Sequence, residues 1–247
     1  MYEKPHEECG LFGVYDPHGQ AVADEAYLAL YALQHRGQES AGIAVNDGGV
    51  IRFHKDVGLV PEVFNEKNLR DLGEGQIAVA HTRYSPGNKQ ERAAAQPLVM
   101  RYVKGTIAIG HNGAISNAGE LREELEQGGA IFQSNCDAEI IAYMIARARL
   151  TSGSVEKAVQ MMMEKVKGAY SLVLMSPRKL LGVRDPHGFR PLSIGKLGDS
   201  YMLASETCAF DSLGAEFVRD VEPGEVVVID KDGLHSHKEM CGGKTSM

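Results

Sequence analysis

Long apolar segments are absent from this sequence of 247 residues, and no stretch approaches the roughly 18 consecutive apolar residues that a bilayer-crossing helix requires. The amino-terminal residues 1–8 also lack the cationic start and apolar segment of a secretion signal. We therefore expect a soluble protein that makes no membrane contact and is located in the cytoplasm.

Clustered basic residues and aromatic residues are scarce as well. The chain has 26 Lys and Arg against 33 Asp and Glu, which gives a net charge of −7, and only 6% of its residues are aromatic. Phosphate binding needs clustered Lys and Arg, and base stacking needs aromatic platforms. Nucleic acid is therefore not expected as a partner, and a small-molecule ligand is favoured.

Cysteine is limited to Cys9, Cys136, Cys208 and Cys241, and no C-x-x-C pair or zinc-finger spacing occurs. This pattern predicts neither a disulfide framework nor a metal site, and it indicates a reducing compartment. An isolated cysteine in a strand is most often a small buried residue, so position alone does not make Cys9 a nucleophile.

Turn residues separate short apolar or alternating runs that are typical of strands. No repeat and no long Pro/Gly/Ser linker divides the chain, so we predict a single domain. Strands are expected over residues 9–15, 42–45, 50–55, 76–84, 98–110, 170–175, 180–184, 192–195, 201–205, 216–218 and 225–230. Helices are expected behind the capping residue Asp24 up to Gly37, and over residues 62–72, 118–127, 138–148 and 155–166.

Two of the expected strands contain continuous apolar runs, 171–175 and 226–229, whereas a sheet with one wet face would alternate. These strands are therefore expected to be buried on both sides. Strands come first, helices occupy the middle and strands return at the end, which favours two stacked sheets with helices on their outer faces. The predicted fold class is α+β, a four-layer αββα sandwich.

Polar residues gather at the ends of the expected strands. They form the segments Gln34-His35-Arg36-Gly37-Gln38, His81-Thr82-Arg83, His111-Asn112-Gly113 and Asn135-Cys136-Asp137. Each segment also has a structural interpretation: a helix end at residues 35–37, a surface ion pair of Arg83, a hairpin turn at Asn112-Gly113, and a helix cap at Asp137. Considered singly, the segments favour these structural roles.

Together with Cys9-Gly10 at the head of the first strand, these segments resemble, in order and spacing, the class II glutamine amidotransferase domain. Members of that family are N-terminal nucleophile hydrolases. The later segments 185–192, 205–210 and 221–225 resemble the glutaminase domain of the amidophosphoribosyltransferase family, which opens purine synthesis. The resemblance implies such a domain over residues 9–247.

Members of this family remove a short leader autocatalytically, and here the leader would comprise residues 1–8. Cys9 would then carry a free α-amine, whose ordinary pKa of about 7.7 to 8.0 leaves roughly a third of it neutral at pH 7.5. Such an amine can act as the base for the thiol of its own residue, whereas the amide of the uncleaved chain cannot accept a proton. The sequence as written is therefore expected to be an inactive precursor.

The resemblance also assigns roles in catalysis and substrate binding. Cys9 would attack the side-chain amide of glutamine, and the Asn112 side chain with the Gly113 backbone N–H would stabilise the oxyanion. Other residues would bind the substrate: Arg83 the α-carboxylate and Asp137 the α-ammonium group, with Arg36, Gly37 and His81 as further contacts. The segment 84–96 would form a lid that excludes water.

The implied activity is hydrolysis of glutamine to glutamate and ammonia through a thioester on Cys9, with the ammonia used to form phosphoribosylamine in purine synthesis. The paired acids of a phosphoribosyl pyrophosphate site are missing, because no Asp-Asp pair occurs. A phosphoribosyltransferase domain or subunit is therefore an expected partner, and a homo-oligomer is compatible with the resemblance. No cofactor is expected within this chain; Mg²⁺ and an iron–sulfur cluster are implied only for a full-length form.

Two other functions are open at this point. The same domain can supply ammonia for glucosamine-6-phosphate or asparagine synthesis, although the segments 184–192 and 205–210 argue against it. A catalytically silent glutamine-binding regulatory module is the other alternative, and the presence of Cys9 with Asn112 and Gly113 disfavours it. Near the carboxyl end, His235 and His237 lack a third ligand and are expected to lie in a solvated tail.

Overall fold

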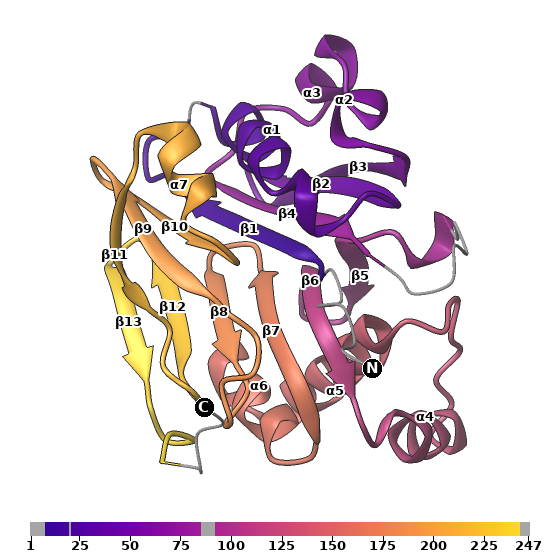
Figure 1. The fold of residues 1–247 in the computed structure, drawn as a ribbon. Helices are drawn as coiled ribbons and strands as arrows, with labels where there is room; N and C mark the ends of the chain where they lie inside the picture. Colours follow the sequence, from indigo (N-terminus) through magenta and orange to yellow (C-terminus); the bar gives the residue numbers. More distant parts are fainter. Residues whose placement is uncertain (1–7, 20, 85–91, 243–247) are drawn as a thin grey trace, which may run out of the picture.

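The computed structural model describes residues 8–19, 21–84 and 92–242, which form two antiparallel sheets (Figure 1). One sheet contains β1 (Gly10–Tyr15), β2 (Ser40–Asp47), β3 (Val50–Val57), β4 (Ile77–Arg83), β9 (Ser193–Leu197), β10 (Ser200–Ala204) and β11 (Glu216–Asp220). The other contains β5 (Leu98–Tyr102), β6 (Gly105–Ile115), β7 (Gly168–Met175), β8 (Leu180–Arg184), β12 (Val226–Asp230) and β13 (Gly233–His237). The strand orders are β11-β9-β10-β1-β4-β2-β3 in the seven-stranded sheet and β13-β12-β8-β7-β6-β5 in the six-stranded sheet.

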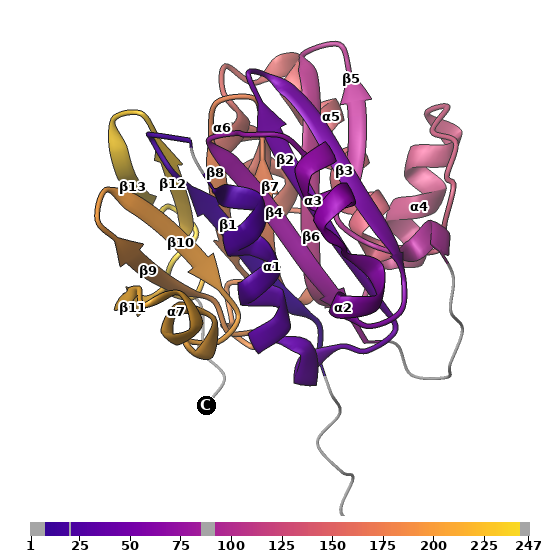
Figure 2. The same cartoon turned by 90° about the horizontal axis from the view of Figure 1, so that it is seen from above.

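Helices cover the outer faces of both sheets (Figure 2). On the side of the seven-stranded sheet lie α1 (Val22–Ala32), the 3-10 helix η1 (Gln34–Arg36), α2 (Val60–Val63), α3 (Glu66–Asp71) and α7 (Cys208–Leu213). On the side of the six-stranded sheet lie α4 (Ala118–Gln127), α5 (Asp137–Thr151) and α6 (Val155–Met163). Among the residues that the structure describes, no helix combines the length and apolarity needed to span a bilayer.

Three apolar cores separate the four layers. One lies between α1 and the seven-stranded sheet and includes Phe12 and Val14, whereas another lies between the two sheets and includes Leu11 and Tyr15. The third lies between the six-stranded sheet and the helices α5 and α6. Alternate residues of β1 therefore point to different cores, as a strand buried on both faces requires. The predicted four-layer αββα sandwich is confirmed.

Two predicted elements are divided in the structure. The run 98–110, predicted as one strand, is a hairpin of β5 and β6, in which Gly105 adopts a φ of +123°. The helix predicted over 62–72 is the pair α2 and α3, because the side chain of Asn65 accepts a hydrogen bond from the backbone N–H of Asn68 and begins a new helix there. Local capping thus overrides the apparent continuity of the helix.

Other differences concern helix starts and elements missed altogether. Asp24, predicted as the cap of the first helix, lies inside α1, which begins at Val22. The short helix α7 and the strand β13 were not expected. His235 lies in β13, where it pairs with Val228 of β12, so the expectation of a solvated tail is wrong. A short polar edge strand gains its order from this pairing and has little apolar alternation of its own.

Candidate active site

Cys9 lies at the amino-terminal end of β1, on the face that points between the two sheets. In β1 the inward face includes Leu11, and Cys9 continues the two-residue alternation. On the adjacent β4, Val79 points inward, so His81 and Arg83 share its face. The two strands therefore direct a thiol, an imidazole and a guanidinium towards the six-stranded sheet.

The facing strands of the six-stranded sheet carry Asn112 and Ser171 in register with each other. Ala108 of β6 and Val173 of β7 belong to the core between the sheets, and the two-residue period places Asn112 and Ser171 on that same face. The side-chain nitrogen of Asn112 and the hydroxyl of Ser171 are buried, and neither has a hydrogen-bond partner among the described residues. A buried donor without a partner is costly to folding, and it is available to a ligand oxygen.

The thiol of Cys9 lies 3.7 Å from the backbone carbonyl oxygen of Tyr84. Burial raises the pKa of Cys9 to about 11, and the cationic side chains of Arg83 and Arg36 only partly offset this effect. The thiol is therefore almost wholly protonated at neutral pH. Its use as a nucleophile requires a base that removes the proton.

Arg36 and Gly37 contact the backbone of two site residues, Cys9 and Arg83 respectively. The Nε of Arg36 donates a hydrogen bond of 3.1 Å to the carbonyl oxygen of Cys9, and its terminal nitrogen pairs with the carboxylate of Glu206. A Cβ at Gly37 would lie 2.6 to 2.8 Å from backbone atoms of Arg83, so only glycine permits this approach. Both residues position the site, and a direct contact with substrate stays a prediction for them.

Arg83 is partly exposed at the carboxyl end of β4. Within the described ranges its guanidinium has no hydrogen-bonded or ion-paired partner, in contrast to the paired guanidinium of Arg36. The surface ion pair considered for Arg83 is therefore not found there. A free planar guanidinium beside a thiol is suited to bind the carboxylate of a small ligand.

Asn112 and Gly113 lie inside β6, so the hairpin interpretation of this dipeptide is wrong. Gly113 adopts a φ of +136°, and a Cβ there would lie 2.0 Å from the carbonyl oxygen of Ala169 on β7. Both the backbone conformation and the close approach of β7 require glycine at this position. The irregular backbone follows directly after the unpaired amide of Asn112.

Asp137 is the first residue of α5, and Cys136 occupies the cap position, so the interpretation of Asp137 as the helix cap is wrong. Its Oδ2 instead accepts a hydrogen bond of 2.9 Å from the backbone N–H of Ile115, which joins α5 to the end of β6. Burial raises the pKa of Asp137, whereas this hydrogen bond and Arg122 act in the opposite direction. The carboxylate thus contacts the end of the strand that carries Asn112.

His81 connects the two sheets. Its ring is fully buried, and Nε2 lies 3.0 Å from the backbone carbonyl oxygen of His111, the neighbour of Asn112. Burial lowers the pKa of His81 to about 3, so the ring is neutral and its Nε2–H donates to that carbonyl. This contact positions β6 beside the site, and substrate binding by His81 stays a prediction.

Two further residues contribute to the site: Gln96, the last residue of the predicted lid, and Lys55, which belongs to no recognised motif. Gln96 accepts a hydrogen bond of 2.8 Å from the backbone N–H of His111, and its Nε2 lies 3.4 Å from the sulfur of Cys136. Lys55 donates a hydrogen bond of 2.6 Å to the carbonyl oxygen of Ala95. Together they hold the end of the predicted lid; residues 85–91 of that lid lie outside the described residues, and residues 92–94 form the 3-10 helix η2 (Arg92–Ala94).

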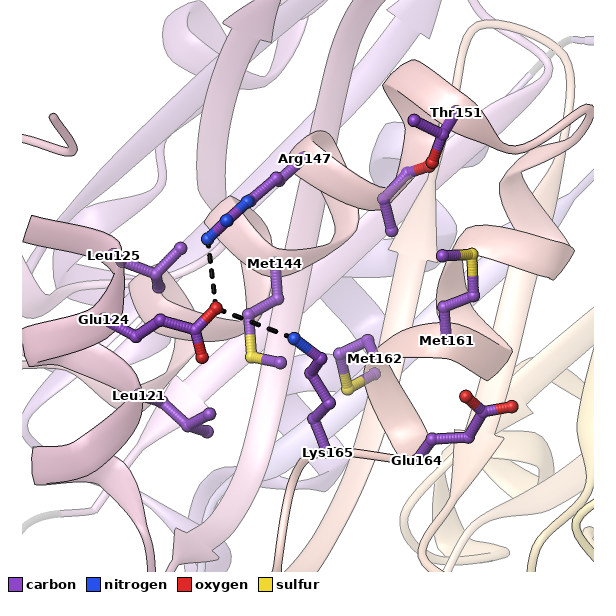
Figure 3. A pocket seen from close by; sticks show the side chains of 11 residues that line it. Leu121, Glu124, Leu125, Met144, Arg147, Thr151, Met161, Met162, Glu164 and Lys165 are labelled. Carbon is purple, nitrogen blue, oxygen red and sulfur yellow. Dashed lines mark hydrogen bonds and ion pairs between the residues drawn. The ribbon is translucent and has the colours of Figure 1, made fainter. Parts of the chain in front are cut away.

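A separate cavity of about 260 Å³ lies between α4, α5 and α6 (Figure 3). Its walls are largely apolar, and Glu124 bridges Arg147 at 3.2 Å and Lys165 at 3.6 Å. Glu124 thus pairs with both of these cations, and no cysteine is among the lining residues. The cavity therefore does not compete with the site around Cys9 as a place for catalysis.

Residues 81–212 match the family model of the glutamine amidotransferase domain. The matched segment is more than half of the chain and contains Arg83, Asn112, Gly113 and Asp137. The chain belongs to the glutamine amidotransferase domain family.

Curated relatives of this amidotransferase domain extend the similarity over nearly the whole chain. The amidophosphoribosyltransferase of Synechocystis sp. is 48% identical and covers 96% of this chain and 48% of its own length. The amidophosphoribosyltransferase of Methanocaldococcus jannaschii is 44% identical and covers 93% of this chain and 49% of its own length. The amidotransferase domain thus spans about half the length of the curated relatives it matches.

Solved structures agree with this assignment. The glutamine phosphoribosylpyrophosphate amidotransferase from B. subtilis, complexed with ADP and GMP, matches with a TM-score of 0.84 and 40% identity over 93% of this chain and 49% of that chain. A class II domain protein from Silicibacter pomeroyi matches with a TM-score of 0.61 at 12% identity and shares the fold. The sandwich predicted from the sequence is thus the fold of this family.

Proposed function

We propose that this chain hydrolyses glutamine to glutamate and ammonia, with Cys9 as an amino-terminal nucleophile. One observation carries the proposal: the buried side-chain nitrogen of Asn112, which has no hydrogen-bond partner among the described residues, lies on the face of β6 that points between the sheets, as the thiol of Cys9 does on its own sheet. A donor held without a partner is what an oxyanion requires, because the donor needs no reorganisation when charge develops. The neighbouring backbone of Gly113 supplies the second donor.

The proposed reaction follows from the protonation states of the thiol and the α-amine of Cys9. The neutral α-amine of Cys9 takes the proton of its own thiol, and the sulfur attacks the side-chain carbonyl carbon of glutamine. The electron pair of the carbonyl moves to its oxygen, which Asn112 and Gly113 stabilise. The C–N bond then breaks, the ammonium of Cys9 returns its proton to the leaving nitrogen, and ammonia departs. Water hydrolyses the remaining thioester and releases glutamate.

The proposal includes removal of residues 1–8. In the uncleaved chain the nitrogen of Cys9 belongs to the peptide bond with Glu8 and cannot accept a proton. The pKa of Cys9, raised to about 11, leaves very little thiolate at neutral pH in the absence of a base. An α-amine with an ordinary pKa near 7.7 to 8.0 meets this need on the same residue.

Recognition of glutamine is assigned to two opposite charges. The free guanidinium of Arg83 would bind the α-carboxylate by two parallel hydrogen bonds, and the carboxylate of Asp137 would bind the α-ammonium group. Asp137 uses Oδ2 for Ile115, and its other oxygen has no hydrogen-bond partner among the residues described. Both charged groups of glutamine are bonded to its α-carbon, so one cation and one anion at the end of the substrate away from its side-chain amide would match a zwitterionic amino acid.

The destination of the ammonia is proposed from the relatives, which are amidophosphoribosyltransferases about twice the length of this chain. We assign the ammonia to phosphoribosylamine formation on a phosphoribosyltransferase domain or subunit. The described residues do not fit an iron–sulfur cluster, because no three cysteines among them bring their sulfur atoms together.

The purified chain should be tested by intact mass and by glutaminase assay. We expect the mass to correspond to a chain beginning at Cys9, and we expect glutamate and ammonia to form in equal amounts. Cys9→Ser should abolish this reaction, whereas Cys241→Ser, a matched change at another partly buried cysteine, should not. A mature chain that binds glutamine and releases no ammonia would identify the silent module instead.

A further inference from the structure

A second group of reactive side chains lies on the outer side of the seven-stranded sheet, where α7 packs beside α1 (Figure 1). His35 of η1 lies close to Glu206 and Cys208, which are located at the start of α7. The Nε2 of His35 is 2.9 Å from Oε2 of Glu206, and the sulfur of Cys208 is 3.7 Å from the same oxygen. All three ligand atoms lie within 4.8 Å of one another.

The hydrogen bonding of His35 fixes the direction of its ring. Its Nδ1 lies 3.1 Å from the carbonyl oxygen of Ala32, which can only accept, so Nδ1 carries a proton. In a neutral ring Nε2 then presents a lone pair, and that lone pair faces a carboxylate oxygen of Glu206. That lone pair and the carboxylate oxygen can serve together as two ligands of one metal ion, because all three ligand atoms of the group lie within 4.8 Å of one another. A backbone carbonyl that orients the ring through Nδ1 is the usual outer contact of a metal-binding histidine.

The donor set identifies the class of ion. A thiolate, an imidazole and a carboxylate suit a borderline-soft divalent cation such as Zn²⁺, and not Mg²⁺ or Ca²⁺. With the usual zinc–ligand distances of about 2.0 to 2.3 Å, tetrahedral ligand atoms lie about 3.2 to 3.7 Å apart. The 3.7 Å between Cys208 and Glu206 agrees with this spacing, whereas the 2.9 Å between His35 and Glu206 would widen when an ion binds. His35 is 57% exposed and Glu206 is 36% exposed, so solvent reaches the group and can fill a fourth position.

We propose that His35, Glu206 and Cys208 form a binding site for a zinc-class divalent cation. On binding, Cys208 releases its thiol proton to solvent and its sulfur coordinates the ion. The site adjoins the catalytic residues, because the other oxygen of Glu206 pairs with Arg36, which holds the carbonyl of Cys9. The spacing of cysteines in the sequence could not indicate it, since His35 and Glu206 are 171 positions apart.

The test uses Co²⁺ as a spectroscopic probe for the full-length chain carrying Cys9→Ala. This change is needed because an amino-terminal cysteine chelates divalent metals through its own amine and thiol. We expect one equivalent of Co²⁺ to bind, with tetrahedral visible bands and the near-ultraviolet band of a cobalt–thiolate bond, and Zn²⁺ to displace it. Failure to observe a saturable thiolate band at one equivalent overturns the proposal.

Variants then locate the site. In the Cys9→Ala chain, Cys208→Ser should abolish the thiolate band and weaken Zn²⁺ binding by about 100-fold or more. Loss of a residue that only contacts a metal ligand would weaken binding less. His35→Gln should weaken binding while keeping the thiolate band, and Cys241→Ser is the matched control that should change neither. A thiolate band that survives Cys208→Ser overturns the assignment.

A second measurement covers the case in which Cys208→Ser does not fold. In the Cys9→Ala chain without further changes, Zn²⁺ should slow alkylation of Cys208 by iodoacetamide at least tenfold, as followed by peptide mass spectrometry. Cys241 should react at the same rate with and without the ion. Equal protection of both cysteines, or of neither, contradicts the proposed site.

Discussion

The guanidinium of Arg190 forms an ion pair with the carboxylate of Glu8, the residue immediately before Cys9. Arg190 belongs to the segment 185–192 that follows β8 in the six-stranded sheet. Asp185 organises this segment by accepting hydrogen bonds from three of its backbone N–H groups. The last residue of the proposed leader is therefore held by an ordered segment of the opposite sheet.

This ion pair predicts an effect on maturation. Cleavage of the bond between Glu8 and Cys9 requires the Glu8 carbonyl to stay beside the attacking group, so Arg190→Gln should slow leader removal. A loss of about 1 kcal/mol, the upper range for a partly exposed pair, corresponds to about fivefold in rate. Intact mass spectrometry at intervals after cell-free synthesis measures the rate.

The control for this prediction is Arg178→Gln, which changes an exposed arginine in the turn between β7 and β8. The rate of leader removal should be the same in that variant as in the unchanged chain. If Arg190→Gln and Arg178→Gln process equally fast, the pair with Glu8 has no role in maturation.

Asn112→Ala should reduce turnover of glutamine far more than its binding. Its amide is expected to bind the oxyanion and to contribute mainly in the transition state, where loss of one donor costs roughly 3 to 4 kcal/mol, or a factor of about 100 to 1,000 in kcat. The measurement is kcat and KM on fully matured protein, with Asn68→Ala in α3 as the control. A KM that rises as much as kcat falls would show that Asn112 binds the ground state.

The order of motifs and the two-residue period together account for much of the site. They place Cys9 and Arg83 at strand ends and Asn112 within β6, all on inward faces, because apolar alternation along each strand sets which side chains point between the sheets. They also predict the layers, since strands such as β7 carry apolar residues on both faces.

Contacts between distant segments could not be predicted in this way. The ion pair of Arg190 with Glu8 and the hydrogen bond of Gln96 with His111 depend on how loops meet, and no local pattern encodes that meeting. The cap function expected of Asp137 failed for a related reason. A tertiary partner, the backbone N–H of Ile115, takes the carboxylate that local propensity assigns to the helix end.

Arg83→Lys and Asp137→Asn should separate substrate recognition from folding. Lysine keeps the charge of Arg83 but loses the planar fork, so KM for glutamine should rise about tenfold or more with an unchanged melting temperature. Asn at position 137 keeps an oxygen that accepts from Ile115 and removes the charge proposed to bind the α-ammonium group. A glutamine analogue without the α-amine should lose little further affinity on Asp137→Asn.

Two outcomes contradict these assignments. If Asp137→Asn leaves glutamine kinetics intact, Asp137 only joins α5 to β6 and the substrate lies elsewhere. If Arg83→Lys lowers the melting temperature by several degrees, the residue has a structural role that its unpaired guanidinium does not indicate.

Because burial raises the pKa of Asp137, KM should also begin to rise, on acidification, at a higher pH than an ordinary aspartate would give.

Two buried histidines predict how stability depends on pH. Burial lowers the pKa of His81 to about 3 and that of His111 to about 4, whereas the unfolded chain has histidine pKa values near 6.5. Below pH 6.5 the unfolded state therefore binds protons that the folded state excludes, so the free energy of unfolding must fall as the pH falls towards 4. Each histidine contributes a slope of up to about 1.4 kcal/mol per pH unit in this window.

Denaturant unfolding at pH 7, 6 and 5 measures that slope directly. His111→Gln should reduce the slope, whatever its effect on stability at pH 7, because glutamine does not titrate. His18→Gln is the matched control, because it replaces an exposed histidine by the same residue. A slope that is the same in all three chains would mean that the ring of His111 gains a proton in the folded protein, which its complete burial opposes.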